Sequence, residues 1–299
     1  MKKEFSEFID FLQEKIKNEI KALDTNSKFK IDKWDRESGG GGLTIAIENG
    51  NLFEKGGVNV SKVFGDLPKS ISKFLNSSGS DFYACGISLI LHPKNPMIPT
   101  FHANLRYFEL YENGIVKDSW FGGGVDLTPY YIFEDDIIFF HKAIKKICDN
   151  FRPNYYEKFK KKCDDYFWNE HRNEARGVGG LFFDHCRESP ENKLKDWFSF
   201  MVDLGNNLMT PYFHIVNKRK EMSFTKKNVE WQQIRRGRYV EFNLIHDKGT
   251  VFGLKTNGRI ESILVSMPPK VKWVYSFNPE KGSEEEKLLK ILKTPRNWI

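Results

Sequence analysis

The sequence predicts an α+β fold in which a large antiparallel β-sheet is flanked by α-helices on both faces. The middle of the 299-residue chain alternates apolar and polar side chains with period two, and short turns join the alternating runs. Stretches with helical periodicity stand before and after this region. No linker or shift in composition divides the sequence, so we expect a single domain that spans residues 1–299.

The first predicted elements are a helix and a flexible loop. Apolar residues recur at helical spacing from Phe5 to Leu23, which predicts an amphipathic opening helix. Four consecutive glycines, Gly39 to Gly42, come after it. Glycine loses more backbone entropy on ordering than any other residue, so this run predicts either a mobile turn or a place where another group approaches the backbone closely, and of the two we expect the flexible loop.

Three strands are predicted next. The runs Phe82–His92 and Thr100–Tyr111 alternate with period two, and the proline-rich stretch Pro93–Pro99 connects them. A third run, Ile115–Phe121, follows the pair Asn113-Gly114, which is typical of a two-residue hairpin turn. The three runs therefore predict adjacent antiparallel strands.

Helices are predicted after these strands, and strands return in the last third. The helical patterns cover Glu134–Asn150, Tyr155–Arg172 and Leu194–Val216, the last of them broken near Pro211. Three alternating runs follow, separated by short turns that include Asn257-Gly258, and they predict an antiparallel meander. The runs are Arg238–His246, Thr250–Thr256 and Arg259–Met267.

Composition and cysteine usage exclude several protein classes. Aromatic residues make up 15% of the chain, which excludes disordered and collagen-like proteins. The net charge of +7 fits an acidic partner without identifying it. The cysteines are too far apart in sequence for a zinc or iron–sulfur motif. With no signal peptide or membrane span in the sequence, we expect a reduced, cytoplasmic protein. The four cysteines are Cys85, Cys148, Cys163 and Cys186.

Motifs for nucleotide and hydrolase chemistry fail on inspection. The stretch Gly122–Asp126 lacks the last glycine of a dinucleotide fingerprint and is not flanked by a βαβ unit. The sequence contains no Gly-x-Ser-x-Gly elbow and no His-Glu-x-x-His pair. The basic cluster Arg235–Arg238 is short and is attached to a predicted strand rather than to a nucleic-acid recognition helix. We therefore expect no nucleic-acid partner.

Strand parity brings polar residues together. Side chains alternate between the two faces of a strand, so Ser88 and His92 share a face, as do His102, Asn104 and Arg106. If the two strands pair, all five lie on one side of the sheet, with apolar residues on the other. This side is either a plain solvated face or a functional one, because polar groups inside a packed layer must be satisfied or used.

Two more histidines lie on apolar helical stripes. His141 and His171 are each either hydrogen-bonded core residues or functional groups. With His92 and His102 they could converge as metal ligands or as a proton-handling group. The sequence alone does not show whether these four side chains meet.

Several blocks resemble the oxygen-dependent coproporphyrinogen-III oxidases of haem biosynthesis. They occur in the order of that family and extend over nearly the whole chain, which makes the resemblance highly specific. The blocks are His102–Phe108, Trp120–Tyr131, Gly177–Asp184, Arg235–Asn243, Gly249–Thr256 and Arg259–Pro269.

The resemblance implies an oxidative decarboxylation. Members of the family convert two propionate side chains of coproporphyrinogen III to vinyl groups, which gives protoporphyrinogen IX. Dioxygen is the electron acceptor, carbon dioxide and hydrogen peroxide are released, and no organic cofactor takes part. The resemblance also implies a homodimer that forms through the predicted strands of residues 239–273.

The resemblance assigns site residues as well. It implies that His102 is a proton donor and that Arg106 and Arg259 bind substrate carboxylates, which suits the forked geometry of guanidinium groups. Leu105 points to the other face, so its contact would come from the backbone. The implied substrate-binding residues are Ser88, Asn104, Leu105, Arg106, Asn257, Gly258 and Arg259. The implied ligands of a divalent metal are His92, His102, His141 and His171.

The catalytic base and two alternative functions stay open. Asp247 matches a family aspartate that would deprotonate a pyrrole N–H, and Asp126 is the next candidate; either could instead cap a turn. Lys248 and Asn257 depart from the family pattern of arginine and glycine. A mononuclear metal-dependent oxygenase and a non-catalytic tetrapyrrole-binding protein are the alternatives.

Overall fold

The computed structural model describes residues 1–67, 79–255 and 258–299. It contains a seven-stranded antiparallel sheet in the order β1-β2-β3-β4-β5-β6-β9, which confirms the predicted α+β class. A separate two-stranded hairpin joins β7 (Trp168–Asn169) and β8 (Glu174–Ala175). The sheet consists of β1 (Lys28–Asp35), β2 (Gly40–Glu48), β3 (Phe53–Asp66), β4 (Asp81–Pro93), β5 (Thr100–Glu112), β6 (Ile115–Thr128) and β9 (Gly180–Cys186).

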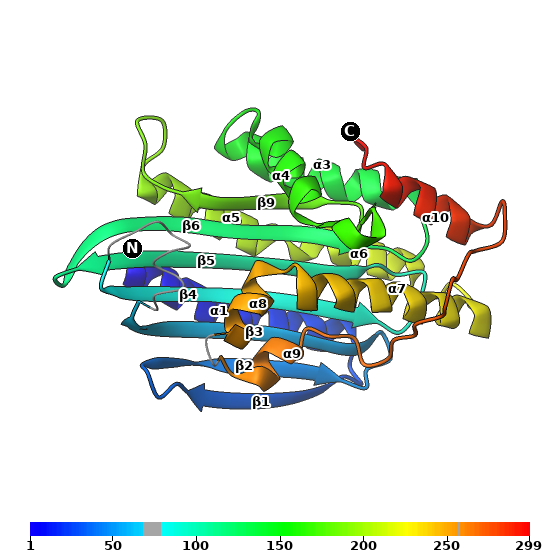
Figure 1. The fold of residues 1–299 in the computed structure, drawn as a ribbon, viewed down its shortest axis with the longest axis horizontal. Helices are drawn as coiled ribbons and strands as arrows, with labels where there is room; N and C mark the ends of the chain where they lie inside the picture. Colours follow the sequence, from blue (N-terminus) through cyan, green and yellow to red (C-terminus); the bar gives the residue numbers. More distant parts are fainter. Residues whose placement is uncertain (68–78, 256–257) are drawn as a thin grey trace.

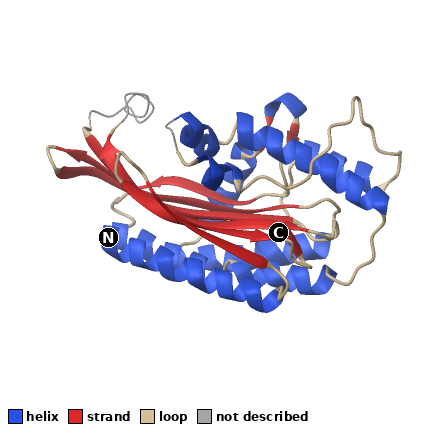
Figure 2. Cartoon of the chain, turned by 90° about the horizontal axis from the view of Figure 1, so that it is seen from below, coloured by secondary structure: helices blue, strands red, loops and turns tan. Residues whose placement is uncertain are grey.

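Helices cover both faces of the sheet. Figure 1 shows α7, α8 and α9 in front of it and α1, α5 and α6 behind it, and Figure 2 shows the sheet between these layers. In the described part of the chain, no helix is both long and apolar enough to cross a membrane. The helices are α1 (Lys2–Leu23), α3 (Glu134–Phe151), α4 (Tyr155–Tyr166), a 3-10 turn (Glu170–Arg172), α5 (Leu194–Asn207), α6 (Met209–Arg219), α7 (Lys226–Ile245), α8 (Lys248–Lys255), α9 (Ile260–Leu264) and α10 (Glu284–Lys293).

The apolar core lies between the back of the sheet and α1. The buried stripe of α1 belongs to the same apolar cluster as the strand side chains on this face of the sheet. Gln13 fixes the helix in place, because its side-chain amide donates to Leu43 O at 2.8 Å and to Val58 O at 2.7 Å. On β4 and β5 the core side includes Ile87 and Leu105. All four cysteines are free and buried.

The flexible loop expected at the glycine run is wrong, and the alternative, a close approach to the backbone, is confirmed. A Cβ on Gly40, Gly41 or Gly42 would lie 2.1–2.3 Å from a carbonyl oxygen of a neighbouring strand. Gly40–Gly42 form the first residues of β2, where Gly42 pairs with Trp34 of β1 on one side and with Ser61 of β3 on the other. Ladder hydrogen bonds on both sides offset the entropy that glycine loses on ordering. The turn between β1 and β2 lies just before Gly40.

The predicted C-terminal meander is also wrong. Residues 238–245 are the second half of α7, which also contains the basic cluster Arg235–Arg238 that was expected beside a strand. α8 and α9 occupy most of the two later runs. The buried residues of α7 recur three and four apart, from Arg235 and Arg236 to Tyr239 and Phe242, so the helix buries a face that the alternating pattern concealed. Asn257, half of the expected hairpin turn, lies outside the described residues.

Two predicted helices have different bounds in the structure. α4 ends at Tyr166, so His171 lies in the 3-10 turn that follows. The stretch Leu194–Val216 is divided between α5 and α6, which confirms the break predicted near Pro211; α6 then continues to Arg219, and Pro211 lies in its first turn. Proline fits there because the first helical N–H groups have no partner within the helix.

Glu241 on α7 joins several segments of the front layer. Its carboxylate accepts hydrogen bonds from Arg172 Nε at 2.7 Å, His171 Nε2 at 2.9 Å and Trp273 Nε1 at 2.8 Å. Burial alone would raise the pKa of Glu241, but these donors and the charge of Arg238 lower it to about 2. The carboxylate therefore favours the folded state only while it is ionised.

Acid should weaken this junction. Because the pKa of Glu241 is lower in the folded protein than in the unfolded chain, its contribution is complete above pH 4.5 and disappears as the pH falls toward 2. We expect this carboxylate to account for up to about 3 kcal/mol of unfolding free energy lost over that range. Urea unfolding between pH about 6 and about 3 measures the loss. Glu241→Gln should flatten the pH dependence and the exposed control Glu188→Gln should not; equal slopes would contradict this role.

Candidate active site

A row of polar side chains crosses the front face of the sheet. Ser88 of β4 pairs directly with Asn104 of β5, and Ser88 is exposed although it stands on a central strand. This confirms that the two strands place their polar residues on one face. The row in register is Asp32, Thr44, Asn59, Ser88, Asn104, Gly124 and Phe182.

Glycines flank Arg106 on the neighbouring strands of this face. Gly86 and Gly122 lie on either side of Arg106 in the sheet. A Cβ on Gly122 would stand 2.8 Å from Arg106 Nε and 2.6 Å from Asp184 Oδ1, so only glycine leaves these side chains room. Gly122 is buried beneath Arg106 and Asp184, whereas Gly86 is partly exposed and Ser88 is exposed. Gly86 and Ser88, with Gly122 beside them under Arg106, form a floor on which a ligand can approach the backbone of β4 closely.

His102 forms a pair with Asp126, its neighbour on β6. His102 Nδ1 lies 2.8 Å from Asp126 Oδ1, and the Asp126 carboxylate also receives two hydrogen bonds from Arg176, at 2.7 and 2.8 Å. Burial would raise the pKa of Asp126, but the charge of Arg176 and the contact with His102 lower it. The ionised carboxylate accepts the Nδ1 hydrogen of His102, which leaves Nε2 as the nitrogen that can exchange a proton with a ligand.

Arg176 is buried in an aromatic cage. Its guanidinium carbon lies 3.8 Å from the ring centroid of Phe167, 4.9 Å from Tyr239 and 5.1 Å from Phe242. Its Nη1 donates to Asn243 Oδ1 at 3.1 Å. Sequence reasoning did not identify Arg176 or Asn243 as site residues, because no local pattern marks an arginine whose acidic partner is 50 positions away.

Arg106 presents a carboxylate-binding group at the edge of the floor. Its Nη1 donates to Asn104 Oδ1 at 2.9 Å, and its Nη2 lies 3.0 Å from Asp184 Oδ2. The side chain is 38% exposed, so an incoming carboxylate can reach it. Asp184, which sequence reasoning also missed, already holds the place that a ligand carboxylate would take. Leu105 faces the core behind the sheet, as predicted.

Asp247 lies at the start of α8. One of its oxygens accepts a hydrogen bond from Tyr166 OH at 2.9 Å, and the other accepts from the backbone N–H of Thr250 at 2.7 Å. The Tyr166 ring stacks on Phe182 with centroids 4.0 Å apart, and Phe182 lies beneath the Arg106 guanidinium at 6.0 Å. Asp247 therefore caps α8. The stacked rings of Tyr166 and Phe182 connect it to Arg106 at the rim of the floor.

The α9 segment lies over the other end of the polar row. Arg259 forms an ion pair with Asp32 of β1, and Ser262 Oγ lies 2.7 Å from Thr44 Oγ1. Four strand spacings, about 19 Å, separate β1 from the Arg106 strand. Gly258 precedes α9, and its N–H donates to Gly253 O at 2.8 Å. Asn257 lies outside the described residues.

The histidines do not fit a shared metal centre. Both ring nitrogens of His92 contact protein oxygens, at 3.3 Å on Thr100 and 2.9 Å on Ser266. His141 likewise contacts Tyr156 OH at 2.8 Å and Val178 O at 3.1 Å, and burial lowers its pKa to about 3. His171 contacts His246 and Glu241. Among the residues described, no three of the metal-binding types gather closely enough to hold an ion.

Comparisons with known proteins agree on one family. The family model described as "Coproporphyrinogen III oxidase" matches residues 4–298. "Coproporphyrinogen-III oxidase 1, chloroplastic" from Arabidopsis thaliana is 48% identical over 99% of this chain and 78% of its own length. "Oxygen-dependent coproporphyrinogen-III oxidase" from Francisella philomiragia is 46% identical over 99% of this chain and 98% of its own length. The Drosophila melanogaster relative of the same name is 46% identical over 91% of this chain and 71% of its own length.

The part of the chain that matches the family includes the whole candidate site. The matches include β5 with His102 and Arg106, the Asp126 strand and the loop of Arg176, so every part of the site described above lies inside the matched range. The chain therefore belongs to the coproporphyrinogen III oxidase family.

Proposed function

We propose that this chain catalyses the oxygen-dependent conversion of coproporphyrinogen III to protoporphyrinogen IX in haem biosynthesis. For each of two propionates, –CH2CH2COOH and O2 become –CH=CH2, CO2 and H2O2. The C–COOH bond breaks, a hydrogen leaves the adjacent carbon, and dioxygen takes up two electrons and two protons. The observation that carries the proposal is the glycine floor in the middle of the sheet, with Arg106 at its edge and the His102–Asp126 pair beside it.

The floor suits a broad ligand that carries carboxylates at its periphery. Arg106 would bind one propionate with its guanidinium fork, in exchange for Asp184. Arg259 stands about four strand spacings away and could bind a second carboxylate in place of Asp32. Ser88 and Asn104 would supply further polar contacts from the floor, and the backbone near Leu105 would complete them.

Proton transfer is divided between two groups in this proposal. His102 Nε2 would give a proton to the reduced oxygen, while Asp126 keeps the imidazole oriented. Asp126 is a poor base because Arg176 and His102 lower its pKa. Asp247 is therefore the base that we propose for the pyrrole N–H. Its link through Tyr166 and Phe182 to the rim supports this role.

Incubation of the purified protein with coproporphyrinogen III, in air and under strict anaerobiosis, tests the proposed function. We expect protoporphyrinogen IX to form in air and no conversion without oxygen. Substrate binding without conversion in air would contradict the proposal and indicate a tetrapyrrole-binding protein. Conversion without oxygen would contradict the role of dioxygen.

We propose in addition that the chain forms a homodimer through residues 239–273. The described residues of this segment include the end of α7, α8 and α9 in place of strands, and they expose Leu244, Ile245 and Ile260, which supports a role in self-association. Sedimentation equilibrium should give twice the chain mass; a monomer at micromolar concentration would contradict this proposal. The free cysteines support a reducing, cytoplasmic location, although two plant relatives are named as chloroplastic.

A further inference from the structure

The carbonyl group of Val178 receives side-chain hydrogen bonds from two distant parts of the chain. Trp298 Nε1 donates at 3.0 Å from 120 positions away, and His141 Nε2 lies 3.1 Å from the same oxygen. The Trp298 ring is 9% exposed and lies parallel to the His141 ring, with centroids 6.4 Å apart. Helix α3, through His141, and the segment after α10, through Trp298, thus both hold the loop between β8 and β9.

This loop is tied to the strand that carries Asp126. Val178 N–H donates to Leu127 O at 3.0 Å, and Leu127 N–H donates back to Gly179 O at 3.3 Å. A Cβ on Gly177 would lie 2.1 Å from Leu127 O, so the two backbones touch. Since Leu127 follows Asp126 directly, a shift of the loop shifts the surroundings of that carboxylate.

Arg176 begins the same loop. Its guanidinium makes the two hydrogen bonds to Asp126, and Asp126 in turn orients His102. Arg176 is only two residues from Val178, so the position of the Val178 carbonyl sets where the arginine side chain starts. A continuous set of contacts therefore runs from Trp298 to His102.

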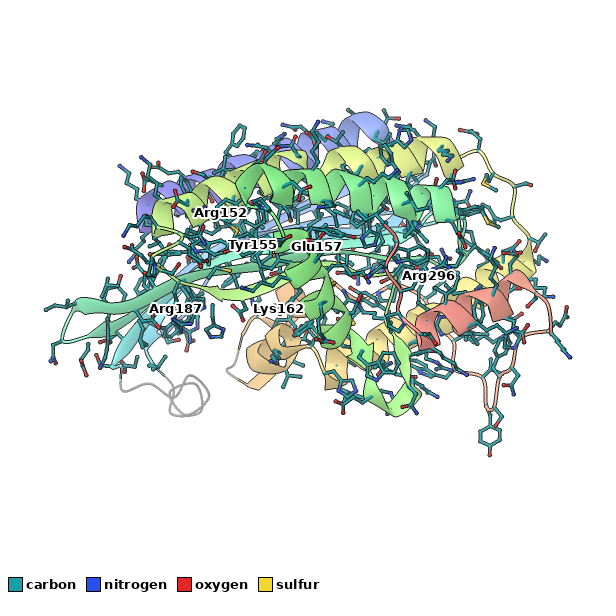
Figure 3. All side chains as sticks on the ribbon, turned by 90° about the horizontal axis from the view of Figure 1, so that it is seen from above. Arg152, Tyr155, Glu157, Lys162, Arg187 and Arg296 are labelled. Atoms are coloured by element: carbon teal, nitrogen blue, oxygen red, sulfur yellow. The ribbon has the colours of Figure 1, made fainter. Side chains whose placement is uncertain are left out.

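The residues beside Trp298 are themselves fixed. The Arg296 guanidinium lies 4.2 Å from the Trp298 ring centroid and donates to Glu134 Oε1 at 2.8 Å. Lys160, which is 3% exposed, donates from Nζ to Arg296 O at 2.8 Å. Figure 3 shows Arg296 on the ribbon that leads away from α10. The segment can thus act as a rigid support for the loop.

We infer that Trp298 is a positioning residue for His102, which acts through the Val178 carbonyl, Arg176 and Asp126. This inference rests on the proposed function where it concerns turnover. Trp298 touches neither His102 nor the floor of the site, so its effect must pass through the loop. Errors of about 1 Å in the placement of reacting groups can cost two orders of magnitude in rate, so a support of this kind matters for catalysis.

Trp298→Phe is the variant that tests this inference. It removes the indole N–H but keeps an aromatic ring beside Arg296 and His141. The matched control is Trp197→Phe, because the buried Trp197 also donates its indole N–H to a backbone carbonyl at 3.0 Å, that of Arg187, on a helix behind the sheet. We expect Trp298→Phe to lower kcat about tenfold with KM within about twofold of wild type, and Trp197→Phe to change neither.

A measurement without substrate separates the inference from the proposed function. In NMR relaxation of the whole protein, Trp298→Phe should lower the order parameter of the His102 ring Cε1–H bond by about 0.2, and the control should not. An unchanged His102 order parameter, or a lower one with unchanged kcat, would overturn the inference. A wild-type protein without oxidase turnover would contradict the proposed function, and the order parameter would still decide whether Trp298 positions His102.

Discussion

Replacement of Arg176 by Met is expected to lower the free energy of unfolding by about 3–5 kcal/mol, the largest effect of any single change that we foresee. The substitution leaves the fully buried Asp126 carboxylate without its two strongest hydrogen bonds. It also removes the cation from the cage of Phe167, Tyr239 and Phe242. Chemical denaturation measures the loss, and turnover should fall as well because His102 loses its oriented partner.

A control and a second variant make this test decisive. Arg187, labelled in Figure 3, makes the same kind of two-point contact with Asp118, but it is 41% exposed. Arg187→Met should therefore cost less than about 1 kcal/mol. Adding Asp126→Asn to the Arg176 variant should restore part of the lost stability, because no buried charge is then left unpaired. Equal losses for the two arginines would contradict the assigned role of Arg176.

The second large effect is expected from His102 and Arg106. His102→Gln should lower kcat by about 10²- to 10⁴-fold, the usual contribution of a general acid or base. Arg106→Ala should mainly raise KM, because it removes a contact to a propionate that is present before and during the reaction. Arg106→Lys should recover only part of the affinity, because lysine keeps the charge but loses the fork. Steady-state kinetics in air with coproporphyrinogen III measure all three.

Neither change should unfold the protein. His102 and Arg106 lie on the front face of the sheet, away from the apolar core behind it, with side chains 17% and 38% exposed, so the melting temperature should move by only a few degrees. His214→Gln is the matched histidine control, because His214 is exposed on α6 and stacks on Phe139 away from the sheet floor. Near-normal kinetics of both site variants would remove these residues from the mechanism.

The central strands could be predicted from the sequence because their signals are local. Alternation along β4 and β5 identifies each strand, and the same parity places His102, Asn104 and Arg106 on one face. The strands predicted for the last third of the chain were wrong, because the periodicity of short apolar runs does not distinguish a strand from a helix. In α7, Tyr239 and Phe242 are buried three residues apart, as in a helix. Val240, Phe242 and Leu244 stand two apart, so the same short run also fits the alternation of a strand.

The remainder of the site depends on contacts between distant segments. Arg176 acquires its role only when β6 and α7 bring Asp126 and Asn243 beside it, and Asp184 only when β9 joins the sheet next to β6. No spacing in the sequence reports such contacts. Resemblance to the family indicated the segments involved, but the pairing of their side chains required the fold.

We propose that oxygen-dependent decarboxylation occurs on the floor beside His102 and Arg106. The most direct test measures CO2 and H2O2 released per coproporphyrinogen III consumed, for the wild-type protein and for His102→Gln at the same substrate saturation. We expect two CO2 and two H2O2 per substrate for the wild type in air, no release without oxygen, and a rate at least about a hundredfold lower for the variant. Release by His102→Gln at the wild-type rate, or CO2 without peroxide, would contradict the account.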